Sequence, residues 1–558
     1  MENSWTYYIL FSLPVLIFLY SKSKPATPIS SIDGPVAQVV GILGNFWEYY
    51  HFGVGVHEFK WQEKYGAVYR IKALFGEDRL IVADPKALQY IYQGAGTKWL
   101  KPELRREFGR IFLGRGIAWA QGDDHKRHRK ILAPAFTNIR THSMIPVFSD
   151  TAERMCQRWQ EELGTAPLRR IEVTDLLLRA TLDAVGEVGF HYKFNSLENN
   201  DNPLAKAYQS LLVNSFGLPS KGKIFAQHAL GYLPVSIIQS LEKLPSRSLA
   251  GLKNVAREGH TVAMQLVNEK KAAVSRGGVD VNDDEDFLDL IVKANLSEHR
   301  ESQLSEEELS AQMRHLTVLA YDDNSSLIDL TYTDLFLLDE TTANSIAFVL
   351  YEISKHPEVQ EKIRQEIVSL KMGIKKLSAN DLELMTYTRA VMKEGLRLHP
   401  VVYGPFLYPA EDDVIPLSRP IRTIDGRMIS EIPIAKGQIV HVSVSGYNRL
   451  KDIWGETAHE FHPERWLQPS EGCKDGSGSP FGVYSNLGNF VGGAQSCLGW
   501  RFAIYEIQTF LVHILSNFKL TYPGDLPRVI RATSGVMAPV LEGEEEKGKR
   551  LVLQISLI

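Results

Sequence analysis

The chain has 558 residues, 44% of them hydrophobic and 23% charged, and this length allows a sizeable core without disulfide support. Its 62 Lys and Arg residues against 66 Asp and Glu residues give a net charge of -4, which argues against a dedicated nucleic-acid-binding protein. With three cysteines far apart in sequence, no disulfide framework is expected, and the reducing cytosol is favoured for most of the chain. Enzyme, receptor and scaffold all remain compatible with this composition.

The N-terminus predicts a membrane anchor over residues 1–24. Residues 5–20 are apolar and uncharged, a little short of the roughly 20 residues that a spanning helix needs. Lys22 and Lys24 follow directly, so the positive-inside rule puts the downstream chain in the cytosol. A cleaved signal peptide and a buried core helix are the alternatives. A signal peptide would carry basic residues before the apolar run and a small-residue cleavage site after it, and neither is present.

The next residues, 25–45, contain several Pro and Gly residues and predict a stiff hinge. The remainder, 46–558, has no composition break that marks a boundary and predicts one large domain. Apolar residues recur at helical spacing over much of 85–400, with a break at His356-Pro357. Short runs of apolar residues predict strands near 67–71, 80–82 and 438–444. The expected fold class is therefore mainly α with a small β portion.

A Gly-rich segment near the C-terminus carries one of the cysteines. Residues 489–503 read Asn-Phe-Val-Gly-Gly-Ala-Gln-Ser-Cys-Leu-Gly-Trp-Arg-Phe-Ala and deliver Cys497 to the start of a helix. A thiolate there would be stabilised by the positive end of the helix dipole, which predicts a lowered thiol pKa. The glycines would let the backbone pass close to a large flat ligand. The alternative is a small buried cysteine beside a tight turn.

This segment resembles the signature of the cytochrome P-450 haem-thiolate monooxygenases, Phe-x-x-Gly-x-x-x-Cys-x-Gly, through Phe490, Gly493, Cys497 and Gly499. The resemblance implies the P-450 fold, a single large catalytic domain, and a haem b cofactor (iron protoporphyrin IX). It makes Cys497 the metal ligand, the axial donor to the haem iron. Gln495 departs from the pattern, since the family usually has Arg or His there to reach a haem propionate.

Two further motifs agree with the resemblance. Glu394 and Arg397 match the family's Glu-x-x-Arg helix, and Arg465 matches the arginine that completes its buried structural cluster. On spacing alone, Glu394 and Arg397 could equally be an ordinary solvated pair. His125 and Arg129 resemble the helix that meets a haem propionate. The neighbouring basic residues would form a docking face for an acidic electron donor, or simply a solvated helix face: Lys126, Arg127 and Lys130.

The oxygen-activating helix is the less regular match. Glu340 and Thr341 resemble the family's acid–alcohol pair, which relays protons during dioxygen activation, although the same run is typical of a helix N-cap. Leu337 and Leu338 stand where the family has small residues. We interpret 317–333 as an insertion, translated intron or gene-model error within this helix, and sequencing the transcript tests that hypothesis.

The implied reaction is insertion of one atom of O2 into a lipophilic small molecule, terpenoid, steroid-like or aromatic, in fungal secondary metabolism or detoxification. Electrons would come from NADPH through a separate cytochrome P-450 reductase, because no Gly-x-Gly-x-x-Gly fingerprint occurs. By resemblance the enzyme is a single-pass protein of the endoplasmic reticulum membrane with its catalytic domain facing the cytosol. The residues that would line the substrate pocket are Val401, Val402, Tyr403 and Gly404. The alternatives are a membrane-anchored haem-binding protein without monooxygenase activity and a haem-thiolate isomerase or dehydratase.

Overall fold

The computed structural model describes residues 27–37, 42–94, 97–198, 218–241, 257, 260–261, 263–272, 286–317, 338–370, 377–467, 481–534 and 536–558. The predicted anchor at 1–24 lies outside these ranges, as does the predicted insertion at 317–333 beyond its first residue. Within the described ranges, no helix has both the length and the apolar character that crossing a bilayer requires.

The α-helices are α2 (Phe46–His51), α3 (Val56–Tyr65), α4 (Pro85–Gln89), α5 (Glu103–Leu113), α6 (Gly122–Leu132), α7 (Asn138–Ser143), α8 (Ile145–Leu163), α9 (Thr174–Phe190), α11 (Lys221–Ala229), α12 (Val235–Leu241), α14 (Phe287–Ser297), α15 (Glu306–Thr317), α16 (Leu338–Lys355), α17 (Pro357–Ser369), α18 (Ala379–Leu384), α19 (Thr386–Leu398), α20 (Val444–Tyr447), α21 (Lys451–Trp454) and α22 (Trp500–Asn517). The strands are β1 (Val68–Lys72), β2 (Asp78–Val82), β3 (Trp99–Leu100), β4 (Arg169–Glu172), β5 (Phe406–Pro409), β6 (Asp413–Arg422), β7 (Met428–Ile434), β8 (Val440–Val442), β9 (Phe518–Thr521), β10 (Val529–Ser534), β11 (Val536–Leu541) and β12 (Val552–Leu557).

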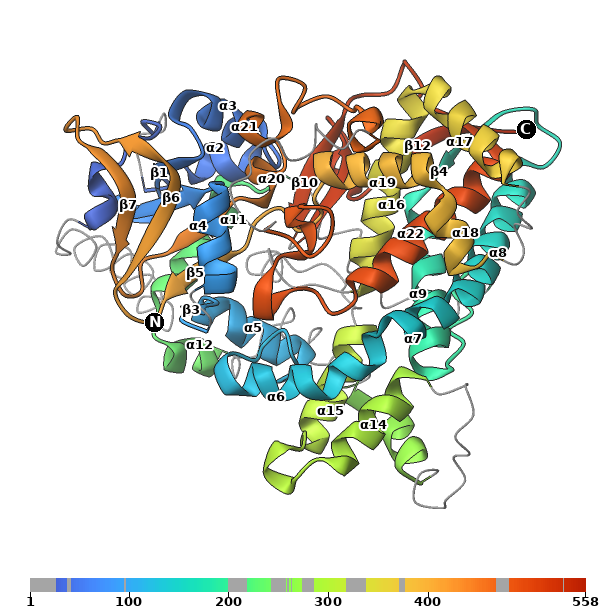
Figure 1. Cartoon of the computed structure of the whole chain (residues 1–558), viewed down its shortest axis with the longest axis horizontal. Helices are drawn as coiled ribbons and strands as arrows, with labels where there is room; N and C mark the ends of the chain where they lie inside the picture. Colours follow the sequence, from blue (N-terminus) through green and yellow to red (C-terminus); the bar gives the residue numbers. More distant parts are fainter. Residues whose placement is uncertain are drawn as a thin grey trace, which may run out of the picture.

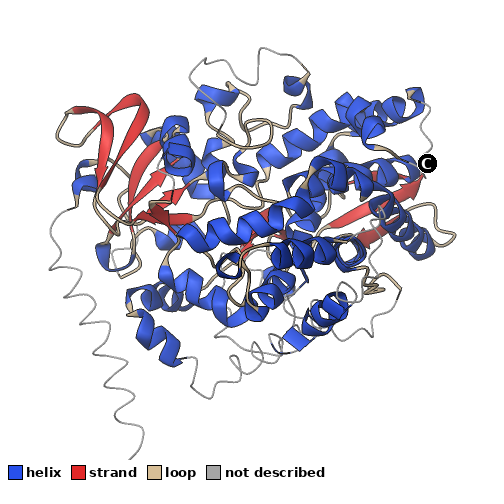
Figure 2. Ribbon diagram, turned by 60° about the horizontal axis from the view of Figure 1, so that its bottom comes forward, coloured by secondary structure: helices blue, strands red, loops and turns tan. Residues whose placement is uncertain are grey.

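Helices make up most of the molecule, and the strands gather mainly toward its two ends (Figures 1 and 2). One sheet has five strands in the order β1-β2-β8-β5-β3, and a second has three in the order β4-β12-β9. Two antiparallel pairs, β6–β7 and β10–β11, complete the β portion. The fold class predicted from the sequence, mainly α with a small β portion, is therefore confirmed.

Helix α16 lies at the centre of the helical region and packs against α9, α19 and α22 (Figure 1). A helix that is apolar on every side belongs inside a large core, and the middle of α16 fits this rule. Its buried apolar residues are Ala343, Ile346, Ala347, Phe348, Val349, Leu350 and Ile353. The predicted break is also confirmed, since α16 ends at Lys355 and α17 begins at Pro357.

The strands were predicted less completely than the helices. Strands β1 and β2 lie where apolar runs predicted them. The strand predicted at 438–444 is shorter, because Ser443 caps α20 by accepting a hydrogen bond from the Gly446 N–H at 2.9 Å. Strands β3, β4 and β5, the β6–β7 pair and the strands after α22 were not predicted. β3 has only 2 residues and β11 is apolar throughout, so neither shows a period-two pattern.

Part of the predicted hinge belongs to the folded domain, which corrects the boundary drawn at residue 46. Ile29 and Ile32 are 0% and 1% exposed and join the core around β6 and β7. Ile32 forms a bridge with Thr423, and the Ile424 N–H donates to the Ser31 carbonyl at 2.8 Å. The apolar residues between the prolines therefore pack onto the sheet.

Candidate active site around Cys497

The loop that carries Cys497 is held by its own backbone. The Cys497 N–H donates to the Phe490 carbonyl at 2.9 Å, and the Ser496 N–H donates to the Gly493 carbonyl at 3.2 Å. Gly499 is the N-cap of α22, which begins at the next residue. Most of α22 is buried, and it packs against α8 and α16. The core thus fixes the helix, and the helix fixes the cysteine.

Two glycines in the loop are required by close backbone approach. Gly493 has φ +62°, and a Cβ there would lie 2.0 Å from the Tyr92 carbonyl oxygen. At Gly492, a Cβ would lie 2.1 Å from the Phe481 carbonyl oxygen. Any larger residue at either position would push the loop away from its neighbours. This gives a packing reason for the glycine that the sequence signature contains.

Cys497 lines a cavity of about 330 Å³ that passes between α6, α16 and the cysteine loop. The volume lies within the range of roughly 300–1,000 Å³ typical of small-molecule sites. Its apolar wall comprises Ile117, Ala118, Leu132, Phe136, Leu396, Val401, Val402, Pro405, Leu407, Phe490, Val491, Leu498, Ala503 and Ile507. Its polar and charged wall comprises Tyr92, Lys101, Arg105, His125, Arg129, Gln312, Thr341, Thr342, Ser345, Asn489, Gln495 and Ser496.

The thiol pKa differs from the sequence expectation. Burial raises the pKa of Cys497 to about 11, while the Gly499 N–H and the Arg129 charge lower it. The expectation of a lowered pKa considered only the helix terminus, and desolvation outweighs that effect. A coordinating metal would deprotonate such a thiol outright. In the free chain, Cys497 is therefore a half-buried, protonated thiol rather than a nucleophilic thiolate, and binding of a metal would convert it to the thiolate.

The structure brings His125 and Arg129 to the same cavity. Arg129 donates to the Ser496 carbonyl from Nη1 at 2.6 Å and to Ser496 Oγ from Nη2 at 2.9 Å. Burial, together with the charges of Lys101 and Arg129, lowers the pKa of His125 to about 4. His125 is therefore neutral at physiological pH, and Arg129 is the fixed charge on this part of the wall.

Glu394, Arg397 and Arg465 form one buried cluster, with side chains 0%, 0% and 2% exposed. Arg397 binds both oxygens of the Glu394 carboxylate, at 2.9 and 2.8 Å, and Arg465 Nε donates to Oε1 at 3.0 Å. The remaining guanidinium donors bind backbone carbonyls of the segment between α20 and residue 460. The cluster thus fastens α19 to the chain that leads to the cysteine loop.

Glu340 and Thr341, the predicted acid–alcohol pair, do not share one wall. Thr341 lines the cavity, and its carbonyl accepts a hydrogen bond from Ser345 Oγ at 2.7 Å. Glu340 is 4% exposed and absent from the cavity wall, and its Oε1 lies 3.7 Å from Lys549 Nζ. Successive residues of a helix point in different directions, which separates the two side chains. Leu337 and the side chain of Leu338 lie outside the described residues.

The predicted substrate-pocket residues divide into two pairs. Val401 and Val402 line the cavity. Tyr403 and Gly404 do not, which corrects that part of the prediction. Tyr403 is buried in the core, and Gly404 packs against β8, where a Cβ would lie 2.5 Å from the Val442 carbonyl oxygen.

The predicted basic docking face is largely neutralised within the chain. Lys126 pairs with Asp123 at 2.9 Å, and Lys130 pairs with Glu298 at 2.7 Å. Arg127 binds both oxygens of Glu308, at 3.0 and 2.7 Å. The two lysine pairs are exposed, and such pairs contribute little to stability.

Several cavity residues were missed from the sequence. Gln312 on α15 accepts from the Ile117 N–H at 3.0 Å and donates to His128 Nδ1 at 2.9 Å, and His128 Nε2 lies 3.1 Å from Glu308. This chain of hydrogen bonds joins α6, α15 and the cavity wall. Lys101 reaches the wall from the segment between β3 and α5, and Arg105 reaches it from the first turns of α5. Each is an isolated residue in sequence, so no local pattern marks it.

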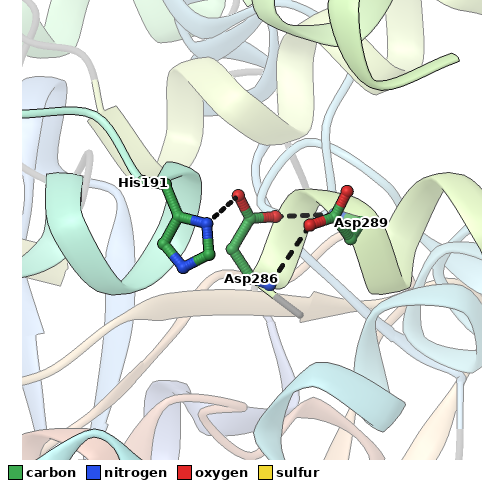
Figure 3. Close-up of side chains that lie close together, drawn as sticks. All are labelled: His191, Asp286 and Asp289. Atoms are coloured by element: carbon green, nitrogen blue, oxygen red, sulfur yellow. Dashed lines mark hydrogen bonds and ion pairs between the residues drawn. The ribbon is translucent and has the colours of Figure 1, made fainter. Parts of the chain in front are cut away.

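A second cluster of potential metal ligands, His191, Asp286 and Asp289, does not line this cavity (Figure 3). Asp286 and Asp289 form the capping box of α14. Lys270 Nζ lies 2.7 Å from Asp286 and 2.8 Å from Asp289. The chain's own ammonium thus provides the positive charge that these carboxylates need, and the cluster is structural.

The cavity at Cys497 suits the haem that the sequence motif predicts. It combines a half-buried thiol, glycines that bring the backbone close, an apolar wall, and permanent cations for the carboxylates of such a cofactor. Soft thiolate ligands and basic side chains toward carboxylates are the donor chemistry that a haem requires.

Comparison with known proteins agrees with the family resemblance found in the sequence. The family model described as Cytochrome P450 matches residues 35–331 and 339–544. A cytochrome P450 monooxygenase of Ampulloclitocybe clavipes, claQ, is 30% identical over 499 residues, covering 89% of this chain and 87% of the relative. Cytochrome P450 monooxygenase 205 of Postia placenta is 29% identical over 544 residues, covering 95% and 93%. Cytochrome P450 monooxygenase 212 of the same fungus is 31% identical over 494 residues, covering 86% of each chain.

Proposed function

This chain belongs to the cytochrome P450 family of oxygen-incorporating oxidoreductases, which bind haem b through a thiolate, and from that premise we propose that it oxidises a lipophilic small molecule with Cys497 as its haem ligand. The observation that carries the proposal is the position of Cys497 on the wall of a largely apolar cavity, at the start of a helix fixed by the core. The haem would supply the dioxygen chemistry, with the thiolate favouring cleavage of the O–O bond.

In this proposal, the residues around the cysteine hold and orient the cofactor. Arg129 carries the charge for a propionate, and neutral His125 beside it offers a hydrogen bond. Phe490 and Gly493 shape the cysteine loop that would hold the haem, and Gly499 donates its N–H to the sulfur. The cluster of Glu394, Arg397 and Arg465 has no contact with the reaction and supports the loop from behind.

Thr341 is the proton-handling residue of this proposal. Its hydroxyl-bearing side chain lines the same cavity as Cys497. A hydroxyl can both accept and donate a proton, which the reduction of dioxygen requires. Glu340 faces Lys549 and supplies no proton directly to the cavity. We therefore assign Glu340 a positioning role at the start of α16.

The apolar wall supports a lipophilic substrate, and fungal secondary metabolism or detoxification is the setting that we propose for it. NADPH would supply electrons through a separate reductase, because the sequence carries no dinucleotide-binding fingerprint. The apolar run at 5–20 and the lysines that follow support insertion in the endoplasmic reticulum membrane with a cytosolic catalytic domain.

The absorption spectrum of the reduced, carbon-monoxide-bound protein tests the ligand. We expect a thiolate-shifted Soret band that disappears in Cys497→Ser and persists in Cys156→Ala. Cys156 is the matched control, since it is buried on α8 and does not line the cavity. An unshifted band in the unaltered protein would overturn the proposal.

Isotopically labelled O2 tests the reaction. With NADPH and reductase, we expect label in the product of a terpenoid, steroid or aromatic substrate. A thiolate band without any reductase-dependent product would instead support the haem-binding alternative. Turnover that needs neither O2 nor NADPH would support the isomerase or dehydratase.

A further inference from the structure

Part of the cavity wall carries more positive charge than the sequence motifs account for. Lys101, Arg105, His125 and Arg129 all line it, and no Asp or Glu of the described residues does so. His125 is neutral, which leaves two permanent guanidinium charges and one lysine. A wall of this kind suits an anion, and a carboxylate is among the anions that Lys and Arg donors bind well.

Lys101 is fixed at this wall by contacts to the start of α6. Its backbone N–H donates to Gln121 Oε1 at 2.7 Å, and Gln121 is the N-cap of α6. Its Nζ donates to the carbonyls of Ala118 at 2.6 Å and Ala120 at 3.4 Å. No acidic side chain among the described residues forms an ion pair with this ammonium. Two carbonyls orient Lys101 but leave its charge uncompensated.

Lys101 lines the same cavity as the cysteine loop. Lys101, His125 and Arg129 line one cavity, and after burial the charges of Lys101 and Arg129 also lower the pKa of His125. Arg129 in turn binds Ser496, which lies between Gln495 and Cys497. Gln495 lines the same cavity and, as an amide, neutralises no carboxylate charge.

We propose that Lys101, with Arg105 beside it, binds a haem propionate and supplies the positive charge that Gln495 lacks. This inference rests on the proposed haem-thiolate function and adds two cofactor-binding residues to it. Burial, with the charges of Arg105 and Arg106, lowers the pKa of Lys101 to about 7. A bound carboxylate would reverse that shift, so the ammonium form and the carboxylate stabilise each other.

Haem loss from the ferric holoprotein to an excess of apomyoglobin tests this proposal. Lys101→Met should speed haem loss by about tenfold, the change expected when one charge-assisted hydrogen bond is lost. Adding Gln495→Arg to Lys101→Met should restore slow loss. Lys126→Met is the matched control, because Lys126 is an exposed lysine of α6 paired with Asp123. It should lose haem at the unaltered rate.

A cofactor with esterified propionates separates charge from structure. When the protein is reconstituted with haem dimethyl ester, Lys101→Met and the unaltered protein should lose the cofactor at equal rates. A difference that persists with the ester would overturn the proposal and assign Lys101 a structural role through Ala118 and Ala120. Unchanged loss of ordinary haem in Lys101→Met would overturn it as well.

Two further measurements distinguish failure of this proposal from failure of the proposed function, and a haem propionate from a substrate carboxylate. Lys101→Met should keep the thiolate-shifted carbon-monoxide band, whereas failure of the proposed function would remove that band from every variant. Lauric acid serves as a probe for a substrate carboxylate at the same wall. If Lys101→Met abolishes the spectral shift caused by lauric acid and leaves haem retention unchanged, the lysine binds a substrate acid and the proposal is wrong.

Discussion

Arg129 binds Ser496 through two hydrogen bonds, from Nη1 to the backbone oxygen at 2.6 Å and from Nη2 to Oγ at 2.9 Å. This pairing joins α6 to the residue that precedes Cys497. A displacement of the helix is therefore transmitted to the position of the sulfur. The planar guanidinium matters for this link, because a single ammonium cannot reproduce its paired donors.

Arg129→Lys should consequently weaken the cysteine loop even though it keeps the charge. Losing one of two hydrogen bonds from a charged donor costs about 1.5–3 kcal/mol. We expect a smaller fraction of the protein to show the thiolate-shifted carbon-monoxide band, with more absorbing at the unshifted position. Lys126→Arg, on the exposed face of α6, serves as the control. An unchanged ratio of the two bands would contradict the link.

Glu394→Gln should destabilise the fold severely. Removing this charge leaves Arg397 and Arg465 buried without their carboxylate, and breaking a buried ion pair typically costs about 3–5 kcal/mol. Urea unfolding should show that loss, together with poor haem content. Glu464→Gln is the matched control, because its exposed pair with Lys362 should cost less than about 1 kcal/mol. Equal stability of the two variants would contradict the structural role of the cluster.

Thr341→Val should uncouple electron use from product formation. The substitution removes the hydroxyl from the cavity wall but keeps the side-chain volume. Product formed per NADPH should fall by about tenfold or more, with hydrogen peroxide in its place, since a positioned proton donor contributes on the order of 10²–10⁴ in rate. Thr342→Val, also at the cavity wall, should have a smaller effect. If the two variants uncouple equally, Thr341 is not the specific proton donor.

Buried histidines predict sensitivity to acid. Burial, followed by the charge of Arg79, lowers the pKa of His441 to about 3, and Tyr49 OH lies 2.5 Å from its Nε2. The unfolded chain binds a proton near the ordinary histidine pKa of about 6.5, whereas the folded chain does not. The contribution of neutral His441 to the free energy of unfolding is therefore fully present above about pH 6.5. It is lost progressively as the pH drops toward 3.

The slope from one such histidine is about 1.4 kcal/mol per pH unit. His399 and His513, each with a pKa lowered to about 4, act in the same direction. Urea unfolding at pH 6.5 and 5.0 measures the loss. His441→Gln keeps a hydrogen-bonding group toward Tyr49 and should show a smaller loss over this interval. Identical slopes in the two proteins would show that His441 does not remain neutral in the fold.

The parts of the site that are formed by residues close together in the chain could be predicted from the sequence. The cysteine loop is compact, and Glu394 and Arg397 lie one helical turn apart, so their side chains meet whatever the tertiary fold. Arg465 could be added only through family resemblance. Lys101 and Gln312 were not predicted, because only the packing of the segment after β3 and of α15 brings them to the cavity. The sequence pattern gives no sign of that packing.

The surrounding core explains two differences from the sequence-based expectations. A lowered pKa was expected at Cys497 from its helix terminus, and the family resemblance paired Glu340 with Thr341 as an acid and an alcohol. The surrounding core decides each outcome, through desolvation of the thiol and through the burial of Glu340 near Lys549.

The middle strand of the second sheet has a consequence for biosynthesis. β12 follows both β4 and β9 in the chain, yet it lies between them and pairs with both. Its neighbour Leu551 donates to Glu172, 379 residues earlier. Until β12 has been synthesised and has left the ribosome, β4 lacks its partner in this sheet. The sheet can therefore close only after β12 has emerged, and a nonsense codon before residue 552 would remove the centre of the sheet.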